Sequence, residues 1–168
     1  MIVSPTSRMG SWYGQLFAGL FVAAAVFMAG QGLLWVYRTM VPISTVFTAS
    51  VAVPDFIRGD DPLTVYDRDI KTDFLGNFTV EVKGVTEGAS YCVGGLEGVT
   101  YGAGEVSDPK ITTLSWYVGP IRTGGAACLT NLAPGQYYLE TNYTIHVDNW
   151  PQRTLRTESN VFSVLALK

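Results

Sequence analysis

The longest apolar run of the chain lies between Arg8 and Arg38, and the residues between these two arginines carry no charge. As an α-helix this run would be roughly 40 Å long, more than the roughly 30 Å of a bilayer's hydrocarbon core. Aromatic residues stand near both of its ends, where amphipathic rings prefer the membrane–water boundary. The pattern predicts a transmembrane helix over residues 11–38, with interface anchors at Trp12, Tyr13, Trp35 and Tyr37.

A cleaved secretory signal peptide is the alternative interpretation of this run. Small residues at Ala23–Ala25 follow a short apolar stretch and would offer a cleavage site. The apolar run continues to Tyr37, however, which favours a retained signal-anchor. Because a single arginine flanks each end, positive charge hardly distinguishes the two orientations. The two cysteines of the remaining chain favour a short cytoplasmic tail over residues 1–10 and a C-terminal domain in the periplasm, outside the cell or on a viral envelope.

Small residues recur along the predicted helix at a spacing of four, at Gly10, Gly14 and Ala18. This spacing lets two helix backbones approach closely, although Gly and Ala are also common in membrane spans for no such reason. Gln15 and Gln31 add polar groups that would prefer a partner inside lipid. We therefore expect these five residues to pack against another membrane helix, either of a different protein or of a second copy.

After Pro42 the pattern changes to alternating apolar and polar residues. The clearest alternation puts Tyr137, Leu139 and Tyr143 on one face of a strand and leaves His146 on the wet face. Turn residues separate several shorter runs of the same kind. We expect these strands over Ile43–Val53, Leu63–Tyr66, Gly76–Val85, Ser90–Gly95, Ile111–Gly119, Ala126–Leu132 and Asn160–Leu167.

Five glycines lie between Gly94 and Gly104 and leave little to pack there. Such a composition predicts a flexible or tightly turning loop, because glycine adopts conformations that other residues avoid. Surface loops often carry recognition. We therefore expect a loop that contacts a partner through Gly94, Gly95, Tyr101 and Gly102.

Several short strands with frequent turns predict an all-β sandwich over residues 39–168. The stretch Leu132–Tyr137, followed by the alternating strand, a turn and a final strand through Val164, resembles the last hairpin of immunoglobulin-like and fibronectin type III-like sandwiches. The resemblance implies that Tyr137 or Tyr138 hydrogen-bonds back to the preceding corner. The chain departs from the immunoglobulin pattern at Cys128, which precedes the tyrosine instead of following it.

The two cysteines, Cys92 and Cys128, both follow the predicted anchor. In a domain delivered across a membrane they predict one disulfide, whereas a reducing compartment would leave two buried thiols. The bond would close a loop of about 37 residues and add about 3–4 kcal/mol to stability.

Charge and motif content argue against several functions. All 14 acidic residues lie at Asp55 or later, and the region after Arg38 has a net charge of −5. This charge distribution does not suit nucleic acid as a partner, because its binding needs clustered Lys and Arg. The single histidine, His146, has no catalytic constellation around it in sequence. An aspartate-rich stretch could bind calcium, but its spacing fits no EF-hand, so a solvated loop is the simpler interpretation. Its aspartates are Asp55, Asp60, Asp61, Asp67, Asp69 and Asp73.

These observations predict a non-enzymatic, single-pass membrane protein without a cofactor or metal, whose partners are the bilayer and other membrane helices. It would act as a structural or interaction subunit, and its layout resembles proteins of bacteriophage genomes and bacterial envelope assemblies. The alternative is an accessory subunit of a larger membrane enzyme or transport complex. A catalytic domain outside the membrane is the third hypothesis.

Overall fold

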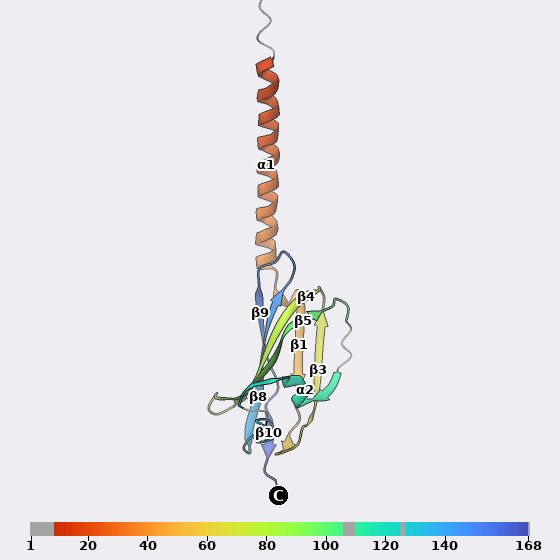
Figure 1. The fold of residues 1–168 in the computed structure, drawn as a ribbon, viewed down its shortest axis with the longest axis vertical. Helices are drawn as coiled ribbons and strands as arrows, with labels where there is room; N and C mark the ends of the chain where they lie inside the picture. Colours follow the sequence, from red (N-terminus) through yellow and green to blue (C-terminus); the bar gives the residue numbers. More distant parts are fainter. Residues whose placement is uncertain (1–8, 106–109, 125–126, 168) are drawn as a thin grey trace, which may run out of the picture. The chain divides into compact units, whose positions relative to one another are not determined.

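The computed structural model describes residues 9–105, 110–124 and 127–167, in two compact units that divide after Val41. The first unit consists of α1 (Met9–Met40), a 32-residue helix (Figure 1). From Gln15 to Met40 this helix is long and apolar enough to cross a membrane, and none of that span is buried. The helix extends two residues beyond each end of the predicted span. The predicted tail lies outside the described residues up to position 8.

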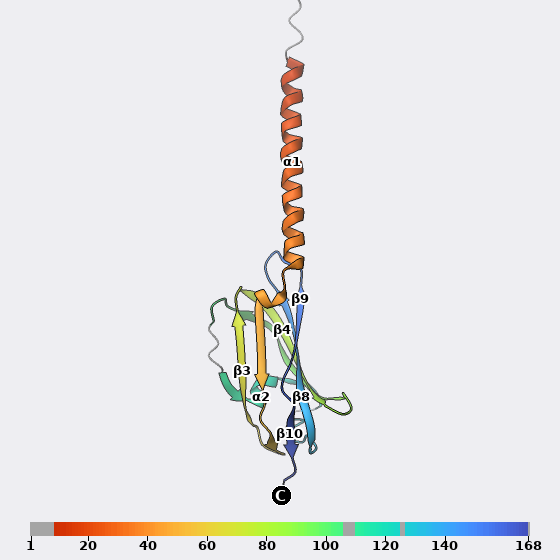
Figure 2. The same ribbon diagram turned by 180° about the vertical axis from the view of Figure 1, so that it is seen from behind.

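The second unit contains two β-sheets, which confirms the predicted all-β sandwich architecture (Figures 1 and 2). A three-stranded sheet has the order β1-β3-β6, and a seven-stranded sheet has the order β2-β10-β8-β4-β5-β7 with β9 also pairing with β8. The described elements of this unit are η1 (Ile43–Thr45), β1 (Phe47–Ala52), β2 (Phe56–Ile57), β3 (Leu63–Ile70), β4 (Phe74–Gly84), β5 (Ser90–Tyr101), β6 (Lys110–Thr113), α2 (Leu114–Val118), β7 (Ile121–Thr123), β8 (Gly135–His146), β9 (Arg153–Glu158) and β10 (Phe162–Leu165).

Two apolar clusters form the core of this unit. The larger one includes the fully buried Val80, Val82 and Leu139 on the central strands β4 and β8. The smaller one is aromatic, and Phe47 from β1 contacts the rings of Phe74, Tyr101 and Tyr143 with centroids 4.9–5.6 Å apart. Because Phe47 comes from the small sheet and the other three rings come from the large one, this cluster joins the two layers.

Strand β8 confirms the clearest alternation of the sequence. Tyr137, Leu139, Tyr143 and their neighbours on that face are buried, and His146 on the other face is exposed. The Tyr137 hydroxyl donates a hydrogen bond to the Ala133 carbonyl oxygen at 2.8 Å, which is the contact that the resemblance implied. Of the two tyrosines considered, Tyr137 therefore makes the bond at the corner.

Several strand predictions were wrong in extent or type. The segment from Gly94 to Tyr101 continues strand β5 instead of forming a loop, because it pairs with β4 along its length. Ile111–Gly119 divides into strand β6 and helix α2, and the helix is capped by the Thr113 hydroxyl, which accepts from the Trp116 amide. The Cys128 segment forms a turn, the chain enters β1 through the helical turn η1, and strand β9 was not predicted.

Cys92 and Cys128 lie at disulfide distance, with their Cα atoms 5.9 Å apart. Cys92 is fully buried on β5, and Cys128 packs against the larger core cluster from the turn before β8. The bond therefore fastens an otherwise strandless segment to the seven-stranded sheet, as the local disulfide predicted from the sequence would do.

Candidate functional site

A cleft of about 440 Å³ lies between the two sheets of the β-domain. Its volume falls within the range of small-ligand pockets, and apolar and aromatic atoms make up most of its wall. Strands β3 and β5 and helix α2 supply most of the lining. The lining residues are Tyr66, Arg68, Phe78, Leu96, Val99, Tyr101, Trp116, Tyr117, Gly119, Pro120 and Tyr143.

The alternation of side chains along β3 and β5 determines which residues form two walls of the cleft. Tyr66 and Arg68 are two residues apart on β3 and so share one face of the small sheet. On β5, Val99 and Tyr101 are likewise two residues apart, and Leu96 joins them across a bulge at which β4 and β5 shift register. In this bulge the Gly98 amide donates to the Asn77 side-chain oxygen at 2.7 Å, and Gly98 has a φ of +66°. The bulge lets these three side chains line one cleft despite their uneven spacing.

Helix α2 supplies the third wall. It buries Leu114, Tyr117 and Val118 and leaves Trp116 63% exposed at the cleft. Its first turn is held by Asp61, whose carboxylate accepts hydrogen bonds from the Ser115 amide at 2.9 Å and from the Ser115 hydroxyl. Gly119 ends the helix with a φ of +71°, a conformation that favours glycine. The helix thus exposes an indole ring beside the buried tyrosines.

Phenol hydroxyl groups give the inner end of the cleft a neutral polar character. The Tyr117 hydroxyl lies 2.9 Å from the Thr141 hydroxyl and 3.5 Å from that of Tyr143, and the Tyr66 and Tyr117 rings are in contact with centroids 5.2 Å apart. Burial raises the pKa of Tyr66, Tyr117 and Tyr143 above the ordinary value. All three phenols therefore stay protonated at physiological pH and can donate or accept hydrogen bonds without charge.

An arginine crosses the outer part of the cleft. The Arg68 guanidinium lies 6.0 Å from the ring centroid of Tyr66 and 5.7 Å from that of Tyr101, and it forms an ion pair with Glu105. Tyr101 in turn stacks on Phe74 with centroids 4.4 Å apart. These contacts fix the orientation of both tyrosine walls, since a cation favours the face of an aromatic ring.

The residue types of common catalytic sites are missing from the described lining of the cleft. Among the described residues that line it there is no histidine, cysteine, serine or carboxylate, and His146 lies on the opposite, exposed face of β8. Within the described part of the chain, no three His, Cys, Asp or Glu side chains gather closely enough to hold a metal ion. The apolar and aromatic wall of the cleft, with its tyrosine hydroxyl groups, is chemically suited to an apolar group that can also form a few neutral hydrogen bonds.

The aspartate-rich stretch is dispersed by the fold. The Asp55, Asp61 and Asp73 carboxylates accept backbone hydrogen bonds from Ser163, Ser115 and Ala103, respectively. These three backbone partners lie in different parts of the domain. Each carboxylate therefore stabilises a different local contact.

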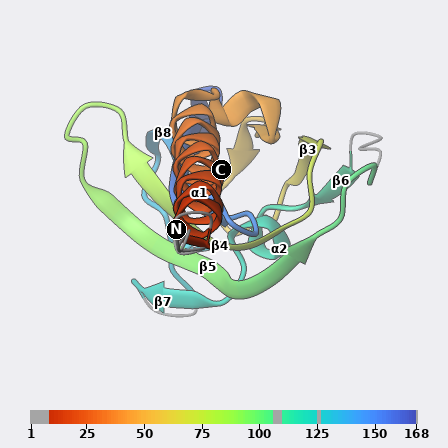
Figure 3. The same ribbon diagram turned by 90° about the horizontal axis from the view of Figure 1, so that it is seen from above.

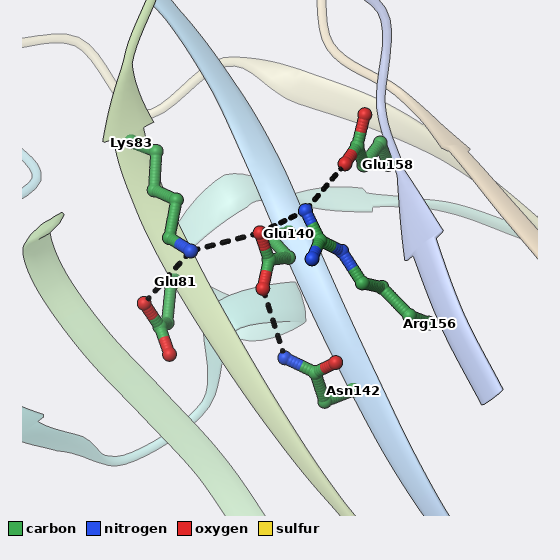
Figure 4. A network of polar contacts seen from close by, with 6 residues as sticks. All are labelled: Glu81, Lys83, Glu140, Asn142, Arg156 and Glu158. Atoms are coloured by element: carbon green, nitrogen blue, oxygen red, sulfur yellow. Dashed lines mark hydrogen bonds and ion pairs between the residues drawn. The ribbon is translucent and has the colours of Figure 1, made fainter. Parts of the chain in front are cut away.

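A second polar cluster lies on the outer face of the seven-stranded sheet (Figure 4). Glu140 is only 5% exposed there and accepts hydrogen bonds from Lys83 at 2.8 Å and Asn142 at 3.2 Å, and it forms an ion pair with Arg156 at 2.8 Å. Figure 4 shows that these partners come from β4, β8 and β9 and converge on one carboxylate. The negative charge of Glu140 is compensated by these three side chains. We therefore interpret the cluster as a structural one that holds β4, β8 and β9 together.

Only part of the cleft was predictable from the sequence. Tyr101 lines it, but Gly94 and Gly95 are buried where α2 and the residue after it pack on β5, so neither glycine forms the predicted exposed loop. Trp116, Tyr66 and Arg68 were missed. Trp116 belongs to Ile111–Gly119, which was predicted as a strand, whereas the structure places it on helix α2, whose first turn is bonded to the distant Asp61.

The remaining predicted residues belong to α1. Gly10, Trp12, Tyr13 and Gly14 lie within its helical backbone. Gln15, Ala18, Gln31, Trp35 and Tyr37 are exposed along it. Their roles in helix packing and at the membrane boundary stay predictions.

The chain was compared with models of known protein families, with curated proteins and with solved structures, and none of them matches it.

Proposed function

We propose that this chain is a single-pass membrane protein that presents an immunoglobulin-like β-sandwich outside the cytoplasm and acts as a non-enzymatic interaction subunit. The observation that carries the proposal is the span Gln15–Met40, an apolar helix in which no residue is buried. A bare apolar surface of this length is costly in water and stable in a bilayer. A bacteriophage virion or a bacterial envelope assembly is the setting that fits this layout.

The β-domain supports a binding role for the part outside the membrane. Its two cysteines are paired at disulfide distance, which suits an oxidising compartment. Its cleft offers aromatic surface and neutral hydroxyl groups, which suit recognition better than bond-breaking chemistry.

An accessory subunit of a larger membrane complex is the second candidate, and a feature of α1 favours it. A shallow groove runs along the helix between Gln15, Gly19 and Ala23. Small residues in such a groove let a neighbouring helix approach closely, and Gln15 could hydrogen-bond across the contact. In this case the helix would carry the main contact with the complex.

Purification of the full chain in a mild detergent, followed by mass determination, tests the proposal. We expect the chain to resist extraction from membranes by alkaline carbonate and to travel with a partner protein. In sealed vesicles of known orientation, a protease on the non-cytoplasmic side should reach the β-domain. A chain that carbonate releases, or that migrates as a monomer from its native membrane, would contradict the interaction-subunit role.

Substitutions in the helix separate the two candidates. Gly14→Leu with Ala18→Leu tests the small-residue stripe, and Gly19→Leu with Ala23→Leu tests the groove. Val26→Leu is the control, because it replaces one large apolar residue by another. Loss of the partner in either double variant would favour the accessory-subunit role, whereas full recovery in both would place the contact in the β-domain.

A further inference from the structure

The cleft opens beside a strand edge that is free over the part of the chain that the structure describes. Strand β5 pairs with β4 along one edge, but on its other edge only Val93 and Gly94 pair, with β7. The cleft-lining residues Leu96, Val99 and Tyr101 all follow this short contact. The backbone groups on that side of β5 can therefore accept an added strand.

The small sheet contributes a second border to the same region. Among the described strands, β6 pairs only with β3 and ends the small sheet. Figure 3 shows β5 and β6 as separate borders of the domain, with α2 between them. A segment that adds to β5 would thus lie over the cleft, with alternate side chains directed into it.

The dimensions and lining of the cleft specify its occupant. A volume of about 440 Å³ holds one large side chain with its flanking backbone, not a folded loop. Trp116 and Leu96 are 63% and 44% exposed at the cleft, so an aromatic ring entering it would cover apolar surface that now contacts water. The hydroxyl groups of Tyr66, Tyr117 and Tyr143 offer neutral hydrogen-bonding groups to an indole N–H or a phenol.

Charge at the cleft adds a further requirement. Lys110 lies opposite Tyr66 in the antiparallel β3–β6 pair and therefore shares its face of the sheet. Among the described residues, Lys110 and Arg68 are thus two basic residues on the same face of the small sheet as Tyr66, and Glu105 is the acidic partner of Arg68, on a domain that is acidic overall. A carboxylate next to the aromatic side chain would complement this local excess of positive charge.

We propose that the cleft is a docking site for an extended segment of a partner protein, in which an aromatic side chain fills the cleft and a neighbouring carboxylate faces Lys110 and Arg68. The backbone of the segment pairs with the free edge of β5. This inference rests on the proposed role as an interaction subunit and names the chemistry of the partner's contact.

The test uses the full chain in detergent micelles and a synthetic probe, acetyl-Thr-Glu-Trp-Thr-Val-amide, with binding followed by isothermal titration calorimetry. Companion probes replace the tryptophan by Tyr, Phe or Ala, or carry N-methyl groups on alternate amides. We expect saturable binding of the aromatic probes, about tenfold weaker binding of the alanine probe, and about fivefold weaker binding of one N-methylated series. Lys110→Glu should weaken binding of the glutamate-containing probe about threefold and remove the salt dependence of that binding.

Two leucines give a matched pair of variants. Leu96 lines the cleft and is 44% exposed, whereas Leu75 on β4 is 50% exposed and does not line it. Leu96→Asp should weaken probe binding at least about tenfold, and Leu75→Asp should leave it unchanged. Trp116→Ala, a second exposed position, should weaken binding in the same way without unfolding the domain. The near-ultraviolet circular dichroism of each variant verifies the fold.

Several outcomes would overturn the inference. They are the absence of binding by every aromatic probe at about 5 mM, equal binding by the Leu96→Asp and Leu75→Asp variants, and equal binding of the tryptophan and alanine probes. A homo-oligomer that dissociates in the Leu96→Asp variant would also contradict the inference, because a second copy of the chain would then fill the cleft. If the chain purifies with a partner protein but does not bind the probes, the proposed cleft site is wrong and the interaction role stands. If the chain purifies alone but binds the probes, the interaction role is wrong and the cleft site stands.

Discussion

At the scale of single residues, the corner before β8 depends on one hydroxyl group. The Tyr137 hydroxyl donates to the Ala133 carbonyl oxygen, and its ring is buried against Phe162 and Tyr91. Tyr137→Phe keeps the ring and removes the bond, so we expect the free energy of unfolding to fall by about 1 kcal/mol. Tyr138→Phe is the control, with no expected change. Urea unfolding of the full chain in micelles measures both, and equal values would contradict the assignment.

The buried carboxylate of Glu140 makes stability depend on pH. Burial alone would raise its pKa, but the hydrogen bonds and charges of Lys83, Asn142 and Arg156 outweigh that effect and hold the pKa below the ordinary value. The folded state therefore binds this proton less readily than the unfolded state. The resulting stabilisation is complete above the ordinary carboxyl pKa and is lost as pH falls through the lowered one.

Glu140→Gln tests this linkage. At neutral pH we expect the variant to unfold with a free energy about 1–2 kcal/mol below that of the wild type, because charged hydrogen bonds are lost. As the pH falls below the ordinary carboxyl range, the two unfolding curves should converge. Glu158→Gln is the control, since Glu158 is an exposed partner of Arg156 and should contribute little. A constant difference between Glu140→Gln and wild type down to low pH would contradict the lowered pKa.

Residue-scale prediction from the sequence succeeded where one strand's own alternation decides burial. The inward face of β8 follows from its period of two, and the structure confirms it. Glu140 belongs to the outward face, yet it is buried because Lys83 and Arg156 cover it from β4 and β9. Strand β9 alternates partly buried and exposed positions and has few apolar residues. Its sequence therefore did not predict a strand that covers Glu140.

At the scale of elements, the contact between β5 and α2 depends on glycine. A Cβ atom added at Gly94 would meet the Val118 carbonyl oxygen and lie 2.7 Å from the Val118 Cγ1 atom. Gly94→Ala must push α2 away from β5, so we expect it to lower the free energy of unfolding by about 1–3 kcal/mol. Gly102→Ala, where the nearest atom lies 3.6 Å away, should change it by less than about 0.5 kcal/mol. Thermal unfolding in micelles compares the two, and equal stabilities would contradict this packing.

The Cys92–Cys128 disulfide is a second contact between elements that we expect to contribute to stability. It holds the turn around Cys128 against β5, and the described residues of that turn have no strand pairing. Replacing both cysteines by alanine should lower the free energy of unfolding by about 3–4 kcal/mol, as the closure of a loop of this length predicts. Reductant should then shift the unfolding of the wild type and leave the variant unaffected. A wild type that is insensitive to reductant would show that the bond is absent.

Element types were predictable only where local pattern and tertiary contacts agree. Gly94–Gly104 was predicted as a loop because its five glycines leave little to pack, but the glycines within β5 permit the close approach of α2 and the bulge in that strand. Ile111–Gly119 was predicted as one strand because its residues alternate. The helix within it depends on Asp61, 54 residues from Ser115, and a contact at that separation leaves no local signal.

At the scale of the whole molecule, the chain divides into a helix and a domain that has its own core clusters. We therefore expect residues 42–168, expressed in an oxidising compartment, to be soluble and to unfold cooperatively. Their free energy of unfolding should match that of the full chain in micelles within about 0.5 kcal/mol. Circular dichroism with urea measures both, and an aggregated or non-cooperative fragment would contradict the division.

The composition of the two units was predictable, and the cleft was not. A charge-free apolar run and a series of short alternating strands are each visible within a window of the sequence. The cleft instead brings Tyr66, Tyr101, Trp116 and Tyr143 together from four elements of both layers. Its position depends on strand order, which hydrophobic alternation does not encode.

The pairing of β10 with β2 has a consequence for the order of events during synthesis. A hydrogen bond beside this pair joins the Asp55 carboxylate to the Ser163 amide of β10, which lies 108 positions further along the chain. At about 5–20 residues per second, roughly 6–25 s pass between the synthesis of Met40 and that of Leu165. Until then β2 lacks its neighbour and the large sheet is incomplete. The large sheet therefore gains its β10 and β2 edge only after almost the whole domain has been synthesised, so we expect the domain to complete its fold after the synthesis of Leu165.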